Sequence, residues 1–148
     1  AVRNDVLDII ATDHAPHTWE EKQNSYFKAP SGVPLVQHSL QALLELYHNG
    51  VFSLETIVKK TSHAVAERFQ VQDRGYIREG YFADLVLLDL GKPYVVNDSN
   101  LLYLCGWSPF NGYRFQSTID MTLVNGQIAW QNGQVTDQVL GKRLTFNR

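Results

Sequence analysis

Hydrophobic and polar positions change their spacing three times along the chain. Residues 6–11, Val-Leu-Asp-Ile-Ile-Ala, are mostly apolar and too few for a helix, so they predict a short, largely buried strand. Residues 12–34 contain three prolines, a Ser-Gly pair and mixed polar residues, and they predict a loop. Within this loop, residues 19–22 indicate an exposed charged turn. Loops of about two dozen residues in compact domains are usually functional or disordered, which makes this one a candidate site.

Helical spacing begins after the loop. Apolar residues fall on one side of a predicted helix at Leu35, Val36, Leu40, Leu43, Leu44 and Tyr47. This helix should end at Asn49-Gly50, a typical C-terminal signal. Ser53 is a plausible N-cap for a second helix, and a third short helix is predicted over residues 63–69 with Thr61 or Ser62 as its cap.

The pattern after Gln70 is that of β-strands. The predicted strands are residues 83–90, 94–96, 119–124 and 127–130. Asn125-Gly126 lies between the last two and is the strongest short-range hairpin signal, and Asn132-Gly133 marks another turn. The predicted order is therefore a strand, a long loop, three helices and several antiparallel strands.

The composition and charge of the chain limit the classes of protein to which it can belong. The chain has 148 residues, 44% hydrophobic and 19% charged, which suits one domain or two small ones. A formal net charge of −2 argues against a nucleic-acid-binding protein, which usually shows a basic face. No apolar stretch approaches the roughly 20 residues that span a bilayer. The single cysteine, Cys105, excludes an internal disulfide and fits a reducing compartment, so we expect a cytoplasmic protein.

Asp13 is the first candidate functional residue. It follows the predicted strand directly, and in α/β barrels the C-terminal ends of the strands carry the catalytic groups. A carboxylate at that position can bind a metal or transfer a proton. It can equally cap a turn by accepting hydrogen bonds from backbone amides. Spacing alone leaves both interpretations open.

The histidines beside Asp13 raise the question of a metal site. Asp-His-x-x-His is a possible zinc-binding set, formed here by Asp13, His14 and His17. Pro16 excludes a regular helix between the two histidines, which makes a purely local zinc site a poor hypothesis. A role for His17 as donor to an anionic ligand is more plausible. The remaining histidines, His38, His48 and His63, are expected to be structural or exposed.

A family resemblance is carried by the loop. The stretch TDHAPHTWEEK, residues 12–22, followed by KAPSGVP, residues 28–34, strongly resembles the last barrel strand and following loop of dihydroorotases, members of the cyclic amidohydrolase family. Allantoinases and dihydropyrimidinases share the Asp-His at the end of the strand but differ just after it. The segment GYIREGYFADLVLLD, residues 75–89, resembles the connection that leads from the family's barrel into a small β-sandwich.

The resemblance implies a fold. We expect an α/β protein in which residues 1–70 form the last strand–helix unit of a metal-dependent TIM-like (β/α)8 barrel, and residues 71–148 form a small β-sandwich domain. GWSPFNG, residues 106–112, and residues 123–135 resemble the return and final hairpins of that sandwich. One departure is Thr-Ser-His-Ala at residues 61–64, where relatives commonly have Asn-Pro-Ala. Ser62 can still cap a helix there, so we interpret the difference as structural variation.

The resemblance also implies site residues. Dihydroorotases interconvert L-dihydroorotate and N-carbamoyl-L-aspartate in pyrimidine biosynthesis, with one or two zinc ions in the complete active site. By resemblance, Asp13 is both a zinc ligand and the general base and acid, and His17 binds the α-carboxylate of the substrate. Main-chain groups at Ser31 and Gly32 close over that carboxylate. The resemblance assigns His14 no role, and we expect it to orient Asp13.

The chain resembles only the C-terminal third or so of a dihydroorotase. A complete barrel needs about 250 residues, whereas the first part of this chain holds one βα unit of about 30. The His-x-His pair and the other metal ligands are absent, so we expect the chain to be inactive without the N-terminal part of the enzyme. A homodimer and a complex with aspartate transcarbamoylase are further partners that the resemblance raises.

Two alternatives to an active dihydroorotase stay open. The first is a non-catalytic dihydroorotase homologue that serves as a structural or regulatory partner of aspartate transcarbamoylase. The presence of Asp13, His17 and the Ala-Pro-Ser-Gly turn favours the enzyme. An allantoinase or another cyclic amidase is the other alternative, although allantoin lacks the α-carboxylate that His17 is expected to bind.

Overall fold

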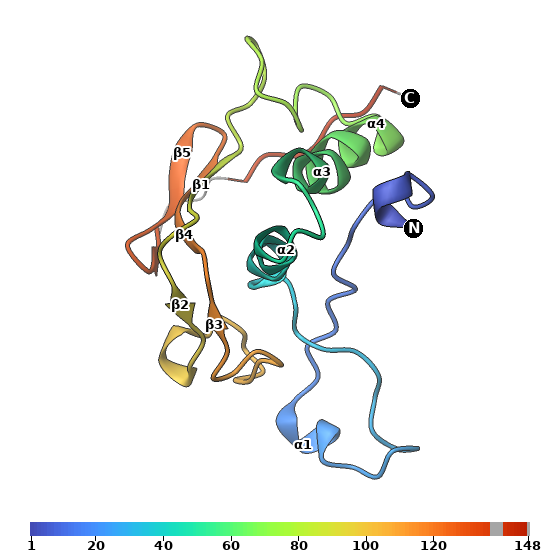
Figure 1. Ribbon diagram of the computed structural model, residues 1–148, viewed down its shortest axis with the longest axis vertical. Helices are drawn as coiled ribbons and strands as arrows, with labels where there is room; N and C mark the ends of the chain where they lie inside the picture. Colours follow the sequence, from blue (N-terminus) through green and yellow to red (C-terminus); the bar gives the residue numbers. More distant parts are fainter. Residues whose placement is uncertain (137–140, 148) are drawn as a thin grey trace.

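A computed structural model describes residues 1–136 and 141–147, so residues 137–140 and 148 of the expected sandwich domain lie outside the described residues. The helices are α1 (Trp19–Lys22), α2 (Ser39–His48), α3 (Leu54–Val58) and α4 (Ala64–Phe69), with 3₁₀ turns at Val2–Asn4 and Asp98–Asn100. Figure 1 shows α2, α3 and α4 between an extended N-terminal segment and the strands. None of the helices in the described part of the chain is long and apolar enough to cross a membrane.

Helix α2 ends where the sequence predicts and begins later. Its C-cap is Asn49, whose amide donates to the Glu45 carbonyl, and Gly50 follows with a φ of 68°. Residues 35–38 form turns instead of the first helical turn. Hydrogen bonds from distant side chains hold this segment, since the Gln37 amide donates to the Tyr103 hydroxyl over 3.0 Å.

The predicted break before the third helix is wrong. Ser53 caps α3 as expected, accepting from the Thr56 amide at 3.2 Å. The chain then continues through a π-helical turn, Lys59–His63, directly into α4. Thr61 donates its hydroxyl to the Ile57 carbonyl one turn back, so it acts inside a helix and caps nothing.

The predicted buried strand at residues 6–11 is not formed among the described residues. Val6 is 71% exposed and Leu7 is 52% exposed. A strand needs a neighbouring strand for its backbone groups, but here the Ile10 amide donates to the Lys60 carbonyl at 3.1 Å and the Val6 amide donates locally to the Ala1 carbonyl at 3.1 Å. The segment is therefore extended but largely unpaired among the described residues.

The strands after Gln70 form two antiparallel sheets. The larger has the order β1-β4-β5-β6, from β1 (Leu85–Asp89), β4 (Thr118–Val124), β5 (Gln127–Gln131) and β6 (Gln134–Val135). The smaller pairs β2 (Tyr94–Val95) with β3 (Arg114–Phe115). Both predicted Asn-Gly turns are confirmed: Asn125 and Gly126 have φ values of 52° and 80°, and Asn132 and Gly133 have 54° and 80°. Positive φ at both central residues is the requirement of a type I′ hairpin.

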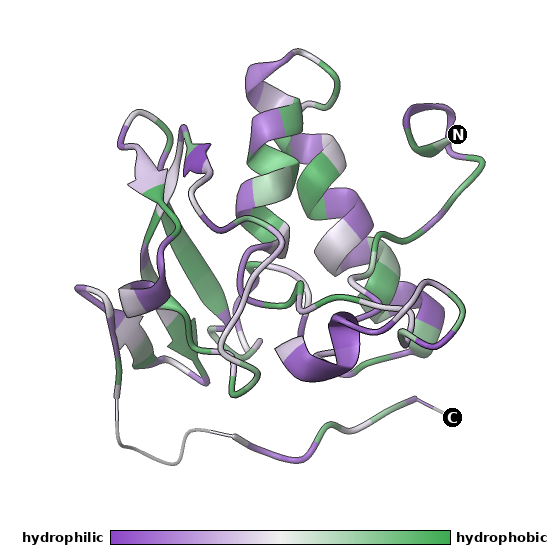
Figure 2. Cartoon of the chain, turned by 90° about the horizontal axis from the view of Figure 1, so that it is seen from below, coloured by the Kyte–Doolittle hydropathy of each residue, from purple (hydrophilic) through white to green (hydrophobic). Residues whose placement is uncertain are grey.

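The hydrophobic core lies between α2, α3 and the start of the larger sheet. Its fully buried members are Leu43, Leu44 and Ile57. Partly buried residues from several segments pack around them: Ile10, Leu40, Leu46, Tyr47, Phe52, Leu54, Leu88 and Leu90. Figure 2 shows hydrophobic and hydrophilic residues alternating along these helices, as expected when one face of each is buried.

The C-terminal segment returns to the end of α4. Val71 and Phe146 form an antiparallel bridge, and the Gln72 amide donates to the Thr145 carbonyl at 2.9 Å. Figure 1 shows the C-terminus beside α4. The expected domain boundary near residue 70 therefore coincides with a point where distant parts of the chain are joined by backbone hydrogen bonds.

Candidate functional site

Asp13 stands at the entrance to the long loop in an unusual backbone conformation. Its φ is 47°, which aspartate tolerates better than most residues, and the residue is exposed. The next residue, His14, forms a parallel bridge with Val33, so the two ends of the loop lie side by side. The loop thus starts and finishes at one place, with Asp13 at its base.

His14 is hydrogen-bonded to the two residues that follow the loop. Its Nδ1 accepts hydrogen bonds from the amides of Leu35, at 3.0 Å, and Val36, at 3.3 Å. A nitrogen that accepts is unprotonated, so neutral His14 carries its proton on Nε2. The structure therefore gives His14 a different task from the expected orientation of Asp13: it fixes the chain just before α2.

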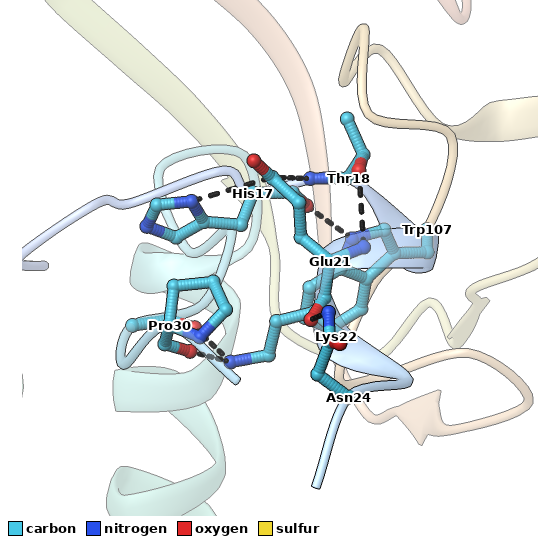
Figure 3. Close-up of polar contacts among 8 residues, drawn as sticks. His17, Thr18, Glu21, Lys22, Asn24, Pro30 and Trp107 are labelled. Carbon is cyan, nitrogen blue, oxygen red and sulfur yellow. Dashed lines mark hydrogen bonds and ion pairs between the residues drawn. The ribbon is translucent and has the colours of Figure 1, made fainter. Parts of the chain in front are cut away.

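His17 is fixed by the helix that follows it. Thr18 caps α1 in a capping box, in which its hydroxyl accepts from the Glu21 amide and its own amide donates to the Glu21 carboxylate. The same carboxylate lies 3.4 Å from Nδ1 of His17 (Figure 3). The Thr18 amide holds the pKa of the Glu21 carboxyl below its usual value, and His17 acts in the same direction. A persistent negative charge therefore orients the half-buried imidazole of His17.

Lys22 links helix α1 to the turn at residues 29–32. Its ammonium donates to the carbonyl of Pro30 at 2.6 Å and to the carbonyl of Gly32 at 3.0 Å (Figure 3). The sequence pattern indicated only an exposed charged turn here, but Lys22 is half-buried. The Ala-Pro-Ser-Gly turn is thus attached to the same short helix that orients His17.

Gly32 allows a close approach between its backbone and Ala15, at the other end of the loop. Its φ is 94°, and a Cβ added there would lie 2.4 Å from the Cβ of Ala15. The adjacent Ala15 amide donates to the Val33 carbonyl at 3.1 Å, and Ser31 is exposed beside it. This contact packs the turn at 29–32 against the strand end that carries Asp13.

Replacing Gly32 with alanine should open this contact. The strained φ and the clash with Ala15 together should cost on the order of 1–3 kcal/mol locally. Hydrogen exchange of the Ala15 amide should then speed about 10- to 100-fold, since about 1.4 kcal/mol corresponds to a factor of ten. Gly50→Ala is the matched control, because Gly50 has a φ of 68° and no atom within 4 Å of an added Cβ. Unchanged exchange at Ala15 in Gly32→Ala would show that the contact does not hold the loop.

Trp107 is a site residue that sequence reasoning missed. Its indole Nε1–H donates to the carbonyl of His17 over 2.8 Å, and its ring lies 5.7 Å from that of Trp19. The two residues of the hydrogen bond are 90 positions apart, so no local pattern links them. The only sequence signal was the GWSPFNG motif, which was interpreted as a turn of the sandwich.

His38 lies buried inside an aromatic cage. It is 0% exposed, and its ring is surrounded by those of Tyr94, Tyr103, Phe110 and Phe115. Its Nδ1 lies 3.4 Å from the hydroxyls of Tyr103 and Ser108, while Nε2 has no hydrogen-bond partner among the described residues. Burial lowers the pKa of His38 to about 4, which keeps the ring neutral at physiological pH.

The structure brings part of the predicted site together. His17, Ser31 and Gly32 belong to one loop whose ends, base and turn are held by the contacts above, with Asp13 at its base. Within residues 1–136 and 141–147, no three His, Cys, Asp or Glu side chains are grouped closely enough to hold a metal ion. Asp13 can therefore contribute one carboxylate to a metal site but cannot complete it.

Comparisons with known proteins identify relatives that match most of this chain. A dihydroorotase from Halobacterium salinarum is 38% identical over 130 residues, covering 88% of this chain and 31% of that protein. An allantoinase from Desulfitobacterium hafniense is 32% identical over 142 residues, covering 95% of this chain and 32% of the allantoinase. Among solved structures, the L-hydantoinase (dihydropyrimidinase) from Arthrobacter aurescens matches with a TM-score of 0.85 and 28% identity, over 91% of this chain and 31% of that one.

The chain thus spans about a third of the length of the relatives it matches. The model of the amidohydrolase family matches residues 1–129, which is most of the sequence. This match shows that the chain belongs to the amidohydrolase family.

Proposed function

We propose that this chain is the C-terminal part of a dihydroorotase, which hydrolyses L-dihydroorotate reversibly to N-carbamoyl-L-aspartate. The observation that carries the proposal is the preorganised His17, whose ring is oriented by Glu21 beside a turn that Lys22 holds. The 38% identity to the Halobacterium salinarum dihydroorotase supports it. On this proposal, residues 1–70 complete a (β/α)8 barrel and residues 71–148 belong to a β-sandwich domain.

Asp13 suits zinc as a ligand, because carboxylate oxygen is one of the donors that zinc accepts. One carboxylate cannot hold the ion, so the other ligands would come from the remaining two-thirds of the protein. Zinc, when bound, would supply a Lewis acid that polarises the ring carbonyl and increases the acidity of water. Asp13 would accept the proton of the attacking water and deliver it to the departing amide nitrogen.

His17 would recognise the substrate's carboxylate. A protonated imidazole donates through both ring nitrogens, so Nδ1 can stay with Glu21 while Nε2 donates to the ligand. Main-chain groups at Ser31 and Gly32 would contact the same carboxylate, since their turn is tied to α1 through Lys22. This arrangement selects a cyclic amide that carries a negative charge.

Replacing His17 with alanine tests the proposal in the full-length protein. We expect the KM for dihydroorotate to rise about 10- to 100-fold, the loss of one charge-assisted hydrogen bond, while the KM for a neutral cyclic amide such as hydantoin changes little. Steady-state kinetics with both substrates measure the difference. His63→Ala is the control, because His63 stacks on Tyr76 away from the loop. Equal KM changes for the two substrates would contradict the carboxylate role.

An allantoinase is the second candidate, because the Desulfitobacterium hafniense allantoinase is 32% identical over 95% of this chain. Allantoin has no carboxylate for His17 to bind. Turnover of allantoin but not dihydroorotate by the full-length protein would therefore favour this candidate. Absence of turnover with both substrates, and of a His-x-His pair upstream, would instead favour a non-catalytic homologue.

A further inference from the structure

We propose that Trp107 is a positioning residue that holds His17 in place for carboxylate recognition, and thereby determines preference for charged substrates. This inference rests on the proposed function. It assigns a task in the site to residues 100–108, a segment that lies far along the chain from the loop. We call this segment the Trp107 arm.

The tip of the Trp107 arm contacts the loop on both sides of Thr18. The indole N–H donates to the His17 carbonyl over 2.8 Å, and the indole ring packs against Trp19, the first residue of α1, with ring centroids 5.7 Å apart. The His17 amide donates in turn to the Ala15 carbonyl at 3.0 Å. Both backbone polar groups of His17 are therefore engaged, which fixes the point from which its side chain projects (Figure 3).

The first residues of the Trp107 arm, 100–103, are hydrogen-bonded to Gln37, which lies just before α2. The Gln37 side chain accepts from the Leu102 amide at 2.8 Å and donates to the Asn100 carbonyl at 2.8 Å. The Gln37 amide donates to the Tyr103 hydroxyl at 3.0 Å. These three hydrogen bonds fix the arm to a segment that the loop also reaches, because His14 accepts from the amides of Leu35 and Val36.

The other side of the arm is anchored next to Trp107. Ser108 is 6% exposed, and its hydroxyl lies 3.4 Å from Nδ1 of the buried His38. The same hydroxyl accepts from the Phe110 amide at 3.1 Å, which stabilises the turn that follows. Trp107 is therefore held from both directions along the chain, and its position can set that of His17.

The experiment compares three variants of the full-length protein. Trp107→Phe keeps an aromatic ring against Trp19 but removes the N–H donor, and Trp107→Ala removes both. Trp130→Phe is the matched control, since Trp130 lies on β5 opposite Val135 of β6. Trp130 lines a cavity with Gln37 and Leu102, but among the described residues no hydrogen bond or ring contact links it to the arm or to the loop. Kinetics with dihydroorotate and with neutral hydantoin are combined with hydrogen exchange of residues 17–22.

We expect Trp107→Phe to raise the KM for dihydroorotate about 3- to 10-fold, the usual effect of losing one hydrogen bond, and Trp107→Ala to raise it further. The kcat for dihydroorotate and the KM for hydantoin should stay within twofold. Exchange of residues 17–22 should accelerate in both variants and remain unchanged in Trp130→Phe. A general structural defect would move kcat and both KM values together, which would overturn the proposal.

The two proposals fail in different ways. If the wild-type protein does not hydrolyse dihydroorotate, the proposed function is wrong, and exchange of residues 17–22 alone decides whether Trp107 positions the loop. If dihydroorotate is hydrolysed but Trp107→Phe matches the wild type in KM and in exchange, the positioning role is wrong. Should Trp107→Ala not fold, Trp107→Phe still carries the test.

Discussion

Replacing Asp13 with asparagine in the full-length protein should lower the kcat for dihydroorotate by about 10²- to 10⁴-fold, the range expected when a general acid–base group is lost. The change preserves the size of the side chain but removes its ability to accept a proton. It also removes a negative charge from the proposed zinc site, so the zinc content of the purified protein should fall. Steady-state kinetics and elemental analysis of the same preparations measure both effects.

Glu79→Gln is the control for this variant. Glu79 is an exposed acid in a turn between α4 and β1, outside the loop, and it should tolerate the change with activity within about twofold of wild type. If Asp13→Asn retained full turnover, both the general-base role and the proposed reaction chemistry at the base of the loop would be refuted.

Stability should fall in acid because of His38. Its pKa is about 4 in the folded protein, below the 6.5 of an ordinary histidine, so the unfolded chain binds the proton more readily between these values. The contribution of neutral His38 to the free energy of unfolding is therefore complete above about pH 6.5. This contribution is lost as the pH falls toward 4. A shift of this size corresponds to about 3 kcal/mol, at 1.36 kcal/mol for each pKa unit.

His38→Asn isolates this effect. Asparagine keeps a polar group near the hydroxyls of Tyr103 and Ser108 but cannot take up a proton in this range. Denaturant unfolding at several pH values should give a shallower decline of the unfolding free energy from pH 6.5 to 4.5 in the variant than in the wild type. Parallel declines in the two proteins would mean that another group causes the acid sensitivity.

Local sequence signals predicted those parts of the fold that depend on neighbouring residues. Ser53 begins a helix and Asn49-Gly50 ends one because the cap is a contact within a few positions. The hairpin at Asn125-Gly126 follows from the backbone conformations that these two residues accept. The TDHAPH and APSG motifs indicated the loop as the candidate site in a different way, through their resemblance to the corresponding motifs of dihydroorotases.

Features that depend on contacts between residues far apart in the sequence could not be predicted from local signals. The segment 6–11 has the composition of a buried strand, but burial requires neighbours that this part of the molecule does not supply. The π-helical turn at Lys59–His63 replaces a predicted helix start, because the chain satisfies its amides by continuing the helix. The bond from Trp107 to His17 joins two loops whose approach is set by the packing of α2 and the strands.

The hydrogen bond between Trp107 and His17 also sets an order of events during biosynthesis. The two residues are 90 positions apart, and ribosomes add about 5–20 residues per second, so His17 is made roughly 5–20 s before its indole partner. The capping box and the hydrogen bonds of Lys22 join residues within 18–32 and need no residue made later, whereas the remaining hydrogen bond needs Trp107. The loop of the nascent chain therefore gains this hydrogen bond only after Trp107 has been synthesised.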